Sequence, residues 1–346
     1  MKVSTLPRLT WNWVTANNAE VRLPLLTAEK KFTQYESHIA LGADFDGAFE
    51  GYSHGLSEDA LKFNLERANW KNDQVYQGSS ERNYIIRLTK AEDRLIDIQK
   101  LHLKEGSETT LIYDYTSEKG AEAFRSSVFE ILAEEDSKLK LILIQRLDKD
   151  AFSMCSVGAI LKGNAKVDVV QIELGAQKTY FNKTGYLLEK GADCRVNTSY
   201  FSDEDRIIDL SYLLKHVGQE TNADMHINGA LKDRARKRFV GTLDFLKGSN
   251  GSVGNEEEFV TLLDEEVKAI ALPLLLAHEH DIVGNHAASA GRIDQDMLYY
   301  IMSRGFSEKE AKSIVVEAKM TPAIDMIPDE KLREEIKESI HEAITK

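Results

Sequence analysis

The sequence predicts a mainly β protein that ends in a small helical region, and three observations carry this prediction. The five prolines stand at 7, 24, 273, 322 and 328, so every residue from 25 to 272 keeps the N–H that a β-ladder needs. Eleven of the 21 glycines fall between 158 and 254, where they are spaced like turns. Apolar and polar residues alternate through the same region, as they do in strands.

The alternation identifies individual strands. We expect the apolar side chains of each strand to face a core and the polar ones to face solvent. The clearest examples are Val170–Leu174, Ile208–Tyr212 and Phe239–Phe245, and the same pattern begins at Leu111–Tyr115 and Leu139–Ile144.

The connections between these strands limit the possible architectures. No long helical pattern interrupts residues 138–275, which argues against a doubly wound α/β sheet, whose parallel strands need helices between them. The segment 120–129 fits a helix or a strand. Ile208, Ile227 and Leu243 recur at intervals that a solenoid coil could have, but without a strict sequence repeat. A sandwich, a barrel and a β-solenoid therefore remain open at this point.

Helices are predicted towards both ends of the chain. Near the N-terminus, residues 57–67 begin with Ser57 as N-cap. Near the C-terminus, residues 297–302 have helical spacing, and Gly305 is a suitable C-cap. Ser307 and Glu310 form a capping box for the next helix. After Pro322 and Pro328 a last helix carries Leu332, Ile336, Ile340 and Ile344 four residues apart.

Composition and charge narrow the class of protein. The 346 residues contain 44 Lys and Arg against 57 Asp and Glu, a net charge of −13. This excess disfavours nucleic acids and anionic membranes as partners. The longest apolar run, Ala269–Ala277, is too short to cross a bilayer. The N-terminus shows no secretory signal, and two cysteines cannot form a disulfide framework. We expect a cytoplasmic protein.

The sequence contains none of several common catalytic motifs. Gly175–Thr179 is the nearest approach to a phosphate-binding loop, but Gln177 stands where that loop requires glycine. The sequence has no Gly-x-Gly-x-x-Gly, His-Glu-x-x-His or Gly-x-Ser-x-Gly. A nucleotide-binding, zinc-protease or serine-hydrolase function therefore has no support.

A few residues could carry chemistry of other kinds. His278, His280 and His286 lie close together in sequence, and imidazoles are common metal ligands. For His278 and His280 we favour a solvated strand end. Cys155 and Cys194 fit buried structural thiols better than redox or ligand thiols. The basic segment 232–240 fits a strand or turn balanced by neighbouring acids better than an anion site.

Several segments resemble the SufB/SufD family, the scaffold subunits of the SUF iron–sulfur cluster assembly machine. The most specific are His286-Ala-Ala-Ser-Ala-Gly-Arg-Ile-Asp294 and Leu298-Tyr-Tyr-Ile-Met-Ser-Arg-Gly305. The others are Gly229–Phe245, Gly254–Glu256, Thr261–Asp264, Pro273–Leu276 and, for the SufD branch, Leu6–Trp13.

The resemblance implies a right-handed parallel β-helix at residues 91–290, an N-terminal α/β region at 1–90 and a C-terminal helical domain at 291–346. The helical domain would dock the SufC ATPase, so the chain itself would not be an enzyme. The candidate docking residues are Leu298, Tyr299, Tyr300, Arg304 and Gly305.

The resemblance also implies a cluster site. The family has a cysteine and a histidine near 284–286, at the interface between SufB and SufD. Here the histidine matches as His286, whereas Gly284 stands at the cysteine position. The chain would then supply one imidazole to a transient iron or iron–sulfur cluster, with thiolates from a SufB partner. Cys155 and Cys194 are weaker ligand candidates.

Three other functions stay open. A SufB-type scaffold would act as a homodimer and assemble a cluster without a different partner. An adaptor would only bind other proteins, with no ligand role for His286. A β-helix enzyme acting on polysaccharides would need an acidic cluster, and the sequence shows no obvious one.

Overall fold

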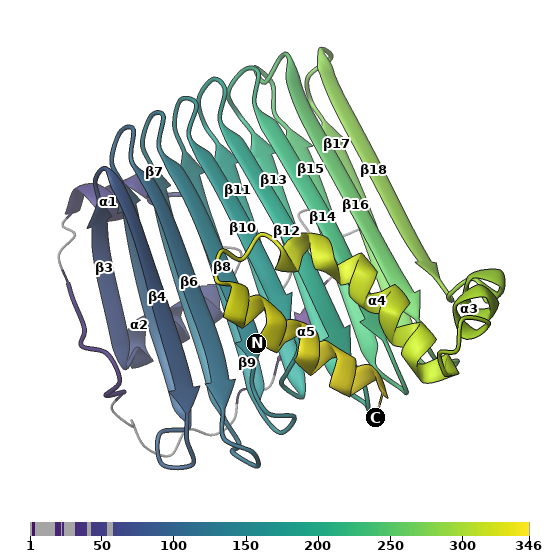
Figure 1. Cartoon of the computed structure of the whole chain (residues 1–346). Coiled ribbons are helices and arrows are strands. Elements are labelled where there is room, and N and C mark those ends of the chain that lie inside the picture. The colour runs from purple at the N-terminus through teal and green to yellow at the C-terminus, as the bar shows by residue number, and fades with distance from the viewer. Residues whose placement is uncertain are drawn as a thin grey trace.

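A computed structural model describes residues 2–3, 18–21, 23, 32–39, 43–53 and 58–345. Its body is a parallel β-solenoid (Figure 1), built from two sheets of eight strands each. Strands alternate between the two sheets along the chain, so two consecutive strands make one coil. This confirms the predicted mainly β class and the parallel β-helix. The division of the chain into three domains stays a prediction.

The strands of the first sheet, here called the even sheet, are paired in register from coil to coil. They are β4 (Ser79–Leu88), β6 (Glu108–Ser117), β8 (Lys138–Arg146), β10 (Lys166–Glu173), β12 (Asp193–Ser202), β14 (Asn222–Leu231), β16 (Ser252–Leu262) and β18 (Ile282–Gly291).

The odd sheet forms the other wall. It contains β3 (Trp70–Tyr76), β5 (Arg94–Leu103), β7 (Phe124–Ala133), β9 (Phe152–Leu161), β11 (Lys178–Leu187), β13 (Ile207–His216), β15 (Arg236–Phe245) and β17 (Lys268–Ala277). The segment 120–129, which the sequence left open, enters β7 and is therefore mostly strand.

The corners between odd and even strands repeat one conformation. A residue with left-handed backbone stands at each of several corners, including Asp136 at φ 56° and Asn164 at φ 53°. Its N–H donates to the carbonyl of the next corner, as from Asp136 to Gly163 at 2.9 Å and from Asn164 to Lys190 at 2.9 Å. The ladder of hydrogen bonds therefore continues around the corner, which keeps the coils in register.

The lumen between the sheets holds the main core. Ile208, Ile227 and Leu243 lie in this core, as expected, together with Leu210 and Phe239. Stacking of the coils aligns inward side chains of successive strands, so each column of the lumen is continuous from coil to coil.

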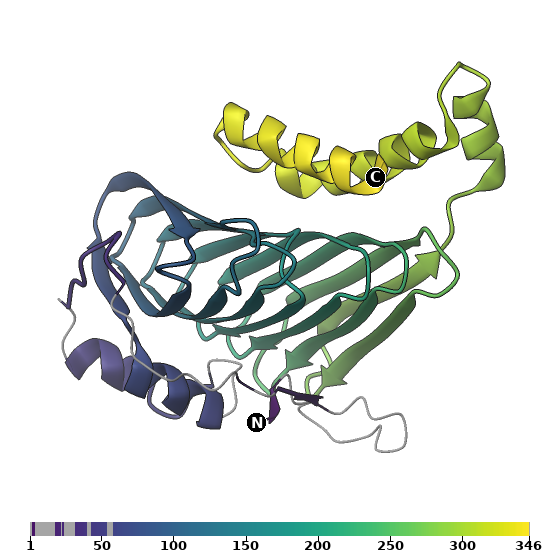
Figure 2. The same ribbon diagram turned by 90° about the horizontal axis from the view of Figure 1, so that it is seen from below.

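Two helices cover the outer face of the even sheet (Figure 2). They are α4 (Glu308–Ile324) and α5 (Glu330–Thr345). Their apolar faces, including Met320, Ile336 and Ile340, pack on Ile144 and Val170. The predicted capping box of Ser307 and Glu310 is present, and the predicted stripe of α5 faces the sheet.

The covering helices overturn one expectation. In β10 the apolar residues Val170 and Ile172 lie on the outer face beneath these helices. The polar Gln171 and Glu173 point into the lumen, where both are buried. Alternation identified the strand correctly, but the apolar face is not the lumenal one, because both faces of this part of the sheet are covered.

Two further expectations differ at the C-terminus. The helix α4 does not end before Pro322 but includes it in its last turn. The cap of α3 (Gln295–Met302) is Ser303, and Gly305 follows with φ 100°. A proline near a helix end removes only one internal hydrogen bond, so the cost is limited there.

The N-terminal helices lie on the odd sheet (Figure 2). They are α1 (Ala43–Ala48) and α2 (Glu58–Arg67), and β1 (Lys2–Val3) pairs antiparallel with β2 (Ala19–Glu20). The helix α2 confirms the predicted one, whereas the proposed N-cap, Ser57, lies outside the described residues. None of the helices in the described ranges is long and apolar enough to cross a membrane.

Candidate functional site

The C-terminal end of the solenoid is the first feature of interest. There β17 and β18 are the terminal strands of their sheets. In β18 His286 is exposed and lies in register with Glu256 of β16, so it stands one coil beyond that residue. An exposed imidazole on a terminal strand can bind a ligand that a partner protein shares.

A charged cluster lies one coil below His286, inside the lumen. Glu256 and Glu258 are 2% and 1% exposed, and Glu258 forms an ion pair with the buried Lys237. Burial, together with the neighbouring Glu258, raises the pKa of Glu256 to about 8. The Lys237 Nζ also donates to the Ile270 carbonyl of β17 at 3.1 Å, which ties the last coil to this cluster.

The position two residues before His286 can accept a side chain only if a neighbouring side chain moves. Gly284 lies in β18, and a Cβ built there would be 2.8 Å from Leu275 Cδ1 and 3.3 Å from Phe245 Cε2. A side chain at this position would therefore require the Leu275 side chain to move. The structure thus supplies an imidazole at this end but no thiolate.

The other two candidate histidines lie at the corner between β17 and β18. His278 and His280 are exposed there, and His278 Nε2 is 3.8 Å from Asp244 Oδ1. Between them, the Glu279 carboxylate accepts hydrogen bonds from the N–H groups of His280 and Gly248, which lower its pKa. This is the solvated strand end that the sequence favoured. Over the described ranges, no three His, Cys, Asp or Glu side chains are arranged to hold a metal ion.

The two cysteines lie far inside the lumen. Cys155 belongs to β9 and Cys194 to β12, and both are buried. Burial raises the pKa of Cys155 to about 12 and that of Cys194 to about 11. Both are therefore thiols at neutral pH, which is unfavourable for binding a surface cluster.

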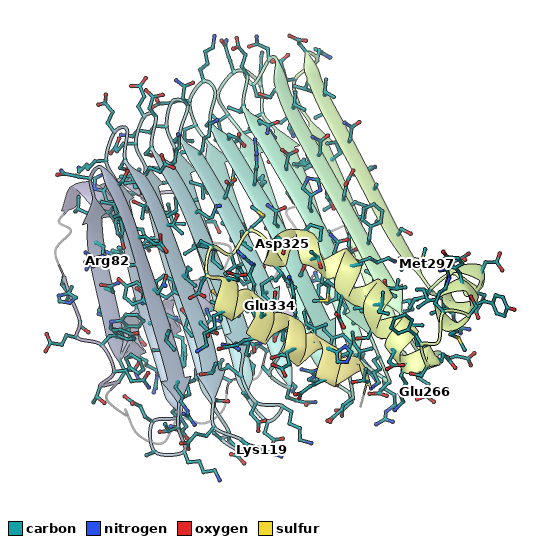
Figure 3. The ribbon with its side chains drawn as sticks, in the orientation of Figure 1. Arg82, Lys119, Glu266, Met297, Asp325 and Glu334 are labelled. Atoms are coloured by element: carbon teal, nitrogen blue, oxygen red, sulfur yellow. The ribbon has the colours of Figure 1, made fainter. Side chains whose placement is uncertain are left out.

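The helix α3 projects from the end of the solenoid (Figure 3), where Met297 is labelled. Leu298 is buried and anchors the helix on Ile293, Ala311 and Val315. The other side of α3 is exposed and apolar. Its exposed side chains are Met297 (49%), Tyr299 (75%), Tyr300 (59%) and Met302 (40%), followed by Phe306 (45%).

Two of the proposed docking residues contact each other on this surface. The Arg304 guanidinium lies 4.9 Å from the centre of the Tyr300 ring, and its Nη2 donates to the Tyr300 hydroxyl at 2.9 Å. Gly305 takes a left-handed backbone just after them. Exposed aromatic side chains held by arginine are typical of protein-binding surfaces.

Acidic residues balance part of the charge of the basic segment 232–240. The Arg238 guanidinium pairs with Asp209 at 2.9 Å, and Lys237 pairs with Glu258. Lys232 Nζ donates to the Ala343 carbonyl at 3.3 Å. Acids thus balance Lys237 and Arg238 in β15, as the sequence favoured, whereas Arg234 and Arg236 are exposed.

Sequence reasoning missed the lumenal acids. Glu256 and Glu258 are the first and last residues of a Glu-Glu-Glu run inside a strand. Two carboxylates two residues apart on a strand must share a face, and in a solenoid that face can be the lumen. The spacing is visible in the sequence, but only the structure shows which face of the strand points into the lumen.

Fold and site together define a β-solenoid whose open strand edges, exposed imidazole and exposed apolar helix all lie at one end. Comparison with known families adds the identity of that solenoid: residues 87–319 match the profile "SUF system FeS cluster assembly, SufBD core domain". The chain therefore belongs to the SufBD family, whose role is in iron–sulfur cluster assembly within the SUF system.

Similar curated proteins agree with this assignment. The chain is 32% identical over 121 residues to the iron–sulfur cluster assembly protein SufD of Bacillus subtilis, covering 35% of this chain and 28% of that protein. It is 21% identical over 210 residues to a SufBD family protein of Mycobacterium bovis, covering 61% and 25%. It is 23% identical over 208 residues to one of Staphylococcus saprophyticus, covering 60% and 45%. The matches thus span less than half the length of these relatives.

Proposed function

We propose that this chain is a SufD-type, non-catalytic subunit that pairs with a SufB-type protein and docks a SufC-type ATPase. The observation that carries the proposal is the end of the solenoid, where His286 is exposed on a terminal strand and Gly284 supplies no thiolate. A cluster at this end would receive one imidazole from this chain and its thiolates from the partner.

The strand edges support pairing at this end. Terminal strands expose N–H and C=O groups that another chain can use for strand addition. In β17 and β18 these groups continue the ladders of the two sheets. A SufB-type solenoid that pairs here would cover His286 and bring its own ligands to the joint.

The exposed face of α3 supports docking of the ATPase. Tyr299 and Tyr300 project from a helix that packs on the rest of the molecule through the buried Leu298 and the partly buried Ile301. When two ATPase subunits close on each other, they would pull on α3 and strain the joint between the solenoids. That strain would open the site to iron and sulfide.

The ligand role of His286 is tested by His286→Ala in the complex with SufB-type and SufC-type proteins. We expect cluster formation, followed by charge-transfer absorbance during anaerobic reconstitution, to fall at least tenfold, because losing even a group that only supports a metal ligand weakens binding by about 10–100-fold. His280→Ala is the matched control, since it removes an exposed histidine of the neighbouring corner. Equal cluster content in all three complexes would remove the ligand role.

The same assay separates this proposal from a SufB-type homodimeric scaffold. The isolated chain should bind little cluster, because the open end presents no thiolate. A stable cluster on the isolated chain would favour the homodimeric scaffold instead.

Docking of the ATPase is tested by Tyr299→Ser together with Tyr300→Ser. We expect at least a tenfold loss of SufC-type affinity, because interface aromatics carry much of the binding energy. Lys331→Ser, which changes an exposed residue of α5, is the control. Point variants are preferable to deletion of residues 294–346, which would uncover the apolar outer face of the even sheet. Unchanged affinity in the tyrosine variant would place the docking surface elsewhere.

A further inference from the structure

The two ends of the solenoid differ in whether another segment lies across their terminal strands. At the C-terminal end β17 and β18 are terminal strands, as described above. At the N-terminal end β3 and β4 are also terminal strands of their sheets. Here, however, residues 32–38 lie across both strands, and we call this segment the N-terminal strap. Figure 3 marks the strapped end with Arg82 of β4 and the other end with Met297.

Two side chains of the strap replace a missing neighbour of β4. The Tyr35 hydroxyl accepts from the Ile85 N–H at 3.0 Å and donates to the Ile85 carbonyl at 3.2 Å. Gln34 does the same for Arg87, its Oε1 accepting from the N–H at 3.0 Å and its Nε2 donating to the carbonyl at 2.5 Å. These are the backbone groups that an added strand would use.

The strap also occupies the edge of β3, through its own backbone. The His38 N–H donates to the Lys71 carbonyl at 2.9 Å, and the Asp73 N–H donates to the His38 carbonyl at 2.7 Å. The Lys71 N–H donates to Ser37 Oγ at 3.1 Å. Both edges at this end are therefore used within the molecule.

Aromatic packing holds the strap in place. The Tyr35 ring stacks on Trp70 at 5.2 Å and meets Tyr84 edge-on at 5.4 Å, measured between ring centres. The Phe32 ring is tilted against Trp70, with 5.5 Å between the ring centres. Because Trp70 is fully buried, the strap also closes this end of the lumen.

We propose that the N-terminal strap prevents a second copy of this chain from adding its β17–β18 edge to β3 and β4. Such an addition would join the C-terminal end of one copy to the N-terminal end of the next. Because a head-to-tail contact need not close into a ring, the copies would grow into a filament. The second copy is the fitting occupant because its terminal strands continue the same parallel ladder. Blocking one end of the solenoid leaves its other end for strand addition, so assembly along the solenoid stops at a pair.

The register shows which residues would oppose each other. Ile85 and Arg87 direct their backbone groups to the strap. By the alternation of a strand, Tyr84, which precedes Ile85, directs its own into the sheet, towards β6. Residues paired in register across the even sheet form a column, and the column that starts at Tyr84 ends at Ala288 in β18. By the same alternation, the Ala288 N–H faces the open edge. The column is Tyr84, Tyr113, Leu143, Gln171, Thr198, Ile227, Glu258 and Ala288.

The test compares the wild-type chain with Gln34→Leu/Tyr35→Phe, which removes the edge hydrogen bonds and keeps the ring of residue 35. We expect hydrogen exchange at Ile85 and Arg87 to accelerate at least about tenfold, because their N–H groups lose their partners. We also expect the weight-average mass in analytical ultracentrifugation to rise with concentration beyond that of the wild type. Tyr35→Phe alone is the milder variant should the double variant lose its circular dichroism spectrum.

A third variant identifies the surface that the added copy uses. Ala288→Pro in the double variant removes an N–H at the open edge, so we expect the mass to return to at most that of the wild type while exchange in β4 stays fast. Larger species that survive this substitution would overturn the head-to-tail contact. Fast exchange in β4 without any increase in mass would overturn the blocking role, and unchanged exchange would show that these side chains do not protect the edge.

Discussion

The lumen contains charged and polar side chains, although a solenoid core does not require them. Lys183 of β11 is fully buried, and its Nζ has no hydrogen-bond partner among the described residues. Burial lowers its pKa below the ordinary value. An unpaired amine in this position costs stability, because it has left water without compensation.

We therefore expect Lys183→Met to raise the free energy of unfolding at pH 7 by ~1–3 kcal/mol. The folded amine binds protons less readily than the unfolded one, so the penalty of Lys183 is largest at low pH. It disappears as the pH rises through the ordinary lysine pKa of 10.5. Urea denaturation at pH 7 and pH 10 should show a smaller gain at the higher pH.

Lys166→Met, which changes an exposed lysine of β10, is the control and should have little effect. A variant at Lys183 that is less stable than the wild type at pH 7 would show that this amine has a stabilising partner.

For single residues, the sequence predicted which positions share a face of a strand better than it predicted where that face points. The residues of β13 and β15 that alternate as apolar do face the lumen, whereas those of β10 face the helices. Alternation shows that two faces differ, but it does not say what covers each face. The inward Glu173 could not be foreseen, because its burial depends on coils that lie far away in sequence.

Among the elements, the pair α4–α5 is held on the solenoid by side-chain packing. Its isoleucines meet an apolar outer face that spans several coils of the even sheet. Polar contacts add to this packing, including the Ser199 hydroxyl, which donates to the Met320 carbonyl at 3.0 Å. The pair is thereby held against the solenoid while α3 stays exposed.

Ile336→Ala should weaken this packing by ~2–4 kcal/mol, because it leaves a cavity at a fully buried position. We expect hydrogen exchange in α5 to accelerate strongly, with the lumenal strands unaffected. Leu332→Ala, at a partly buried position of the same helix, should have a smaller effect. Equal acceleration in the lumenal strands would mean that helices and solenoid unfold as one unit.

The helical elements were readable from the sequence because their signals are local. The capping box at Ser307 and the four-residue spacing in α5 needed no knowledge of the rest of the chain. The strap at residues 32–38 was not predicted, because its role comes from contacts with residues about fifty positions away.

For the whole molecule, the central claim is that the open end of the solenoid contributes His286 to a cluster shared with a partner. The family resemblance and Gly284 were visible in the sequence, whereas the buried acids beneath His286 and the open strand edges needed the structure.

The most direct measurement is pulsed EPR of the reduced cluster in the complex with SufB-type and SufC-type proteins, with ¹⁵N-histidine in this chain alone. We predict a ¹⁵N coupling from one coordinated imidazole that disappears in the His286→Ala complex. A cluster without any ¹⁵N coupling, or a coupling that persists in that variant, would contradict the account.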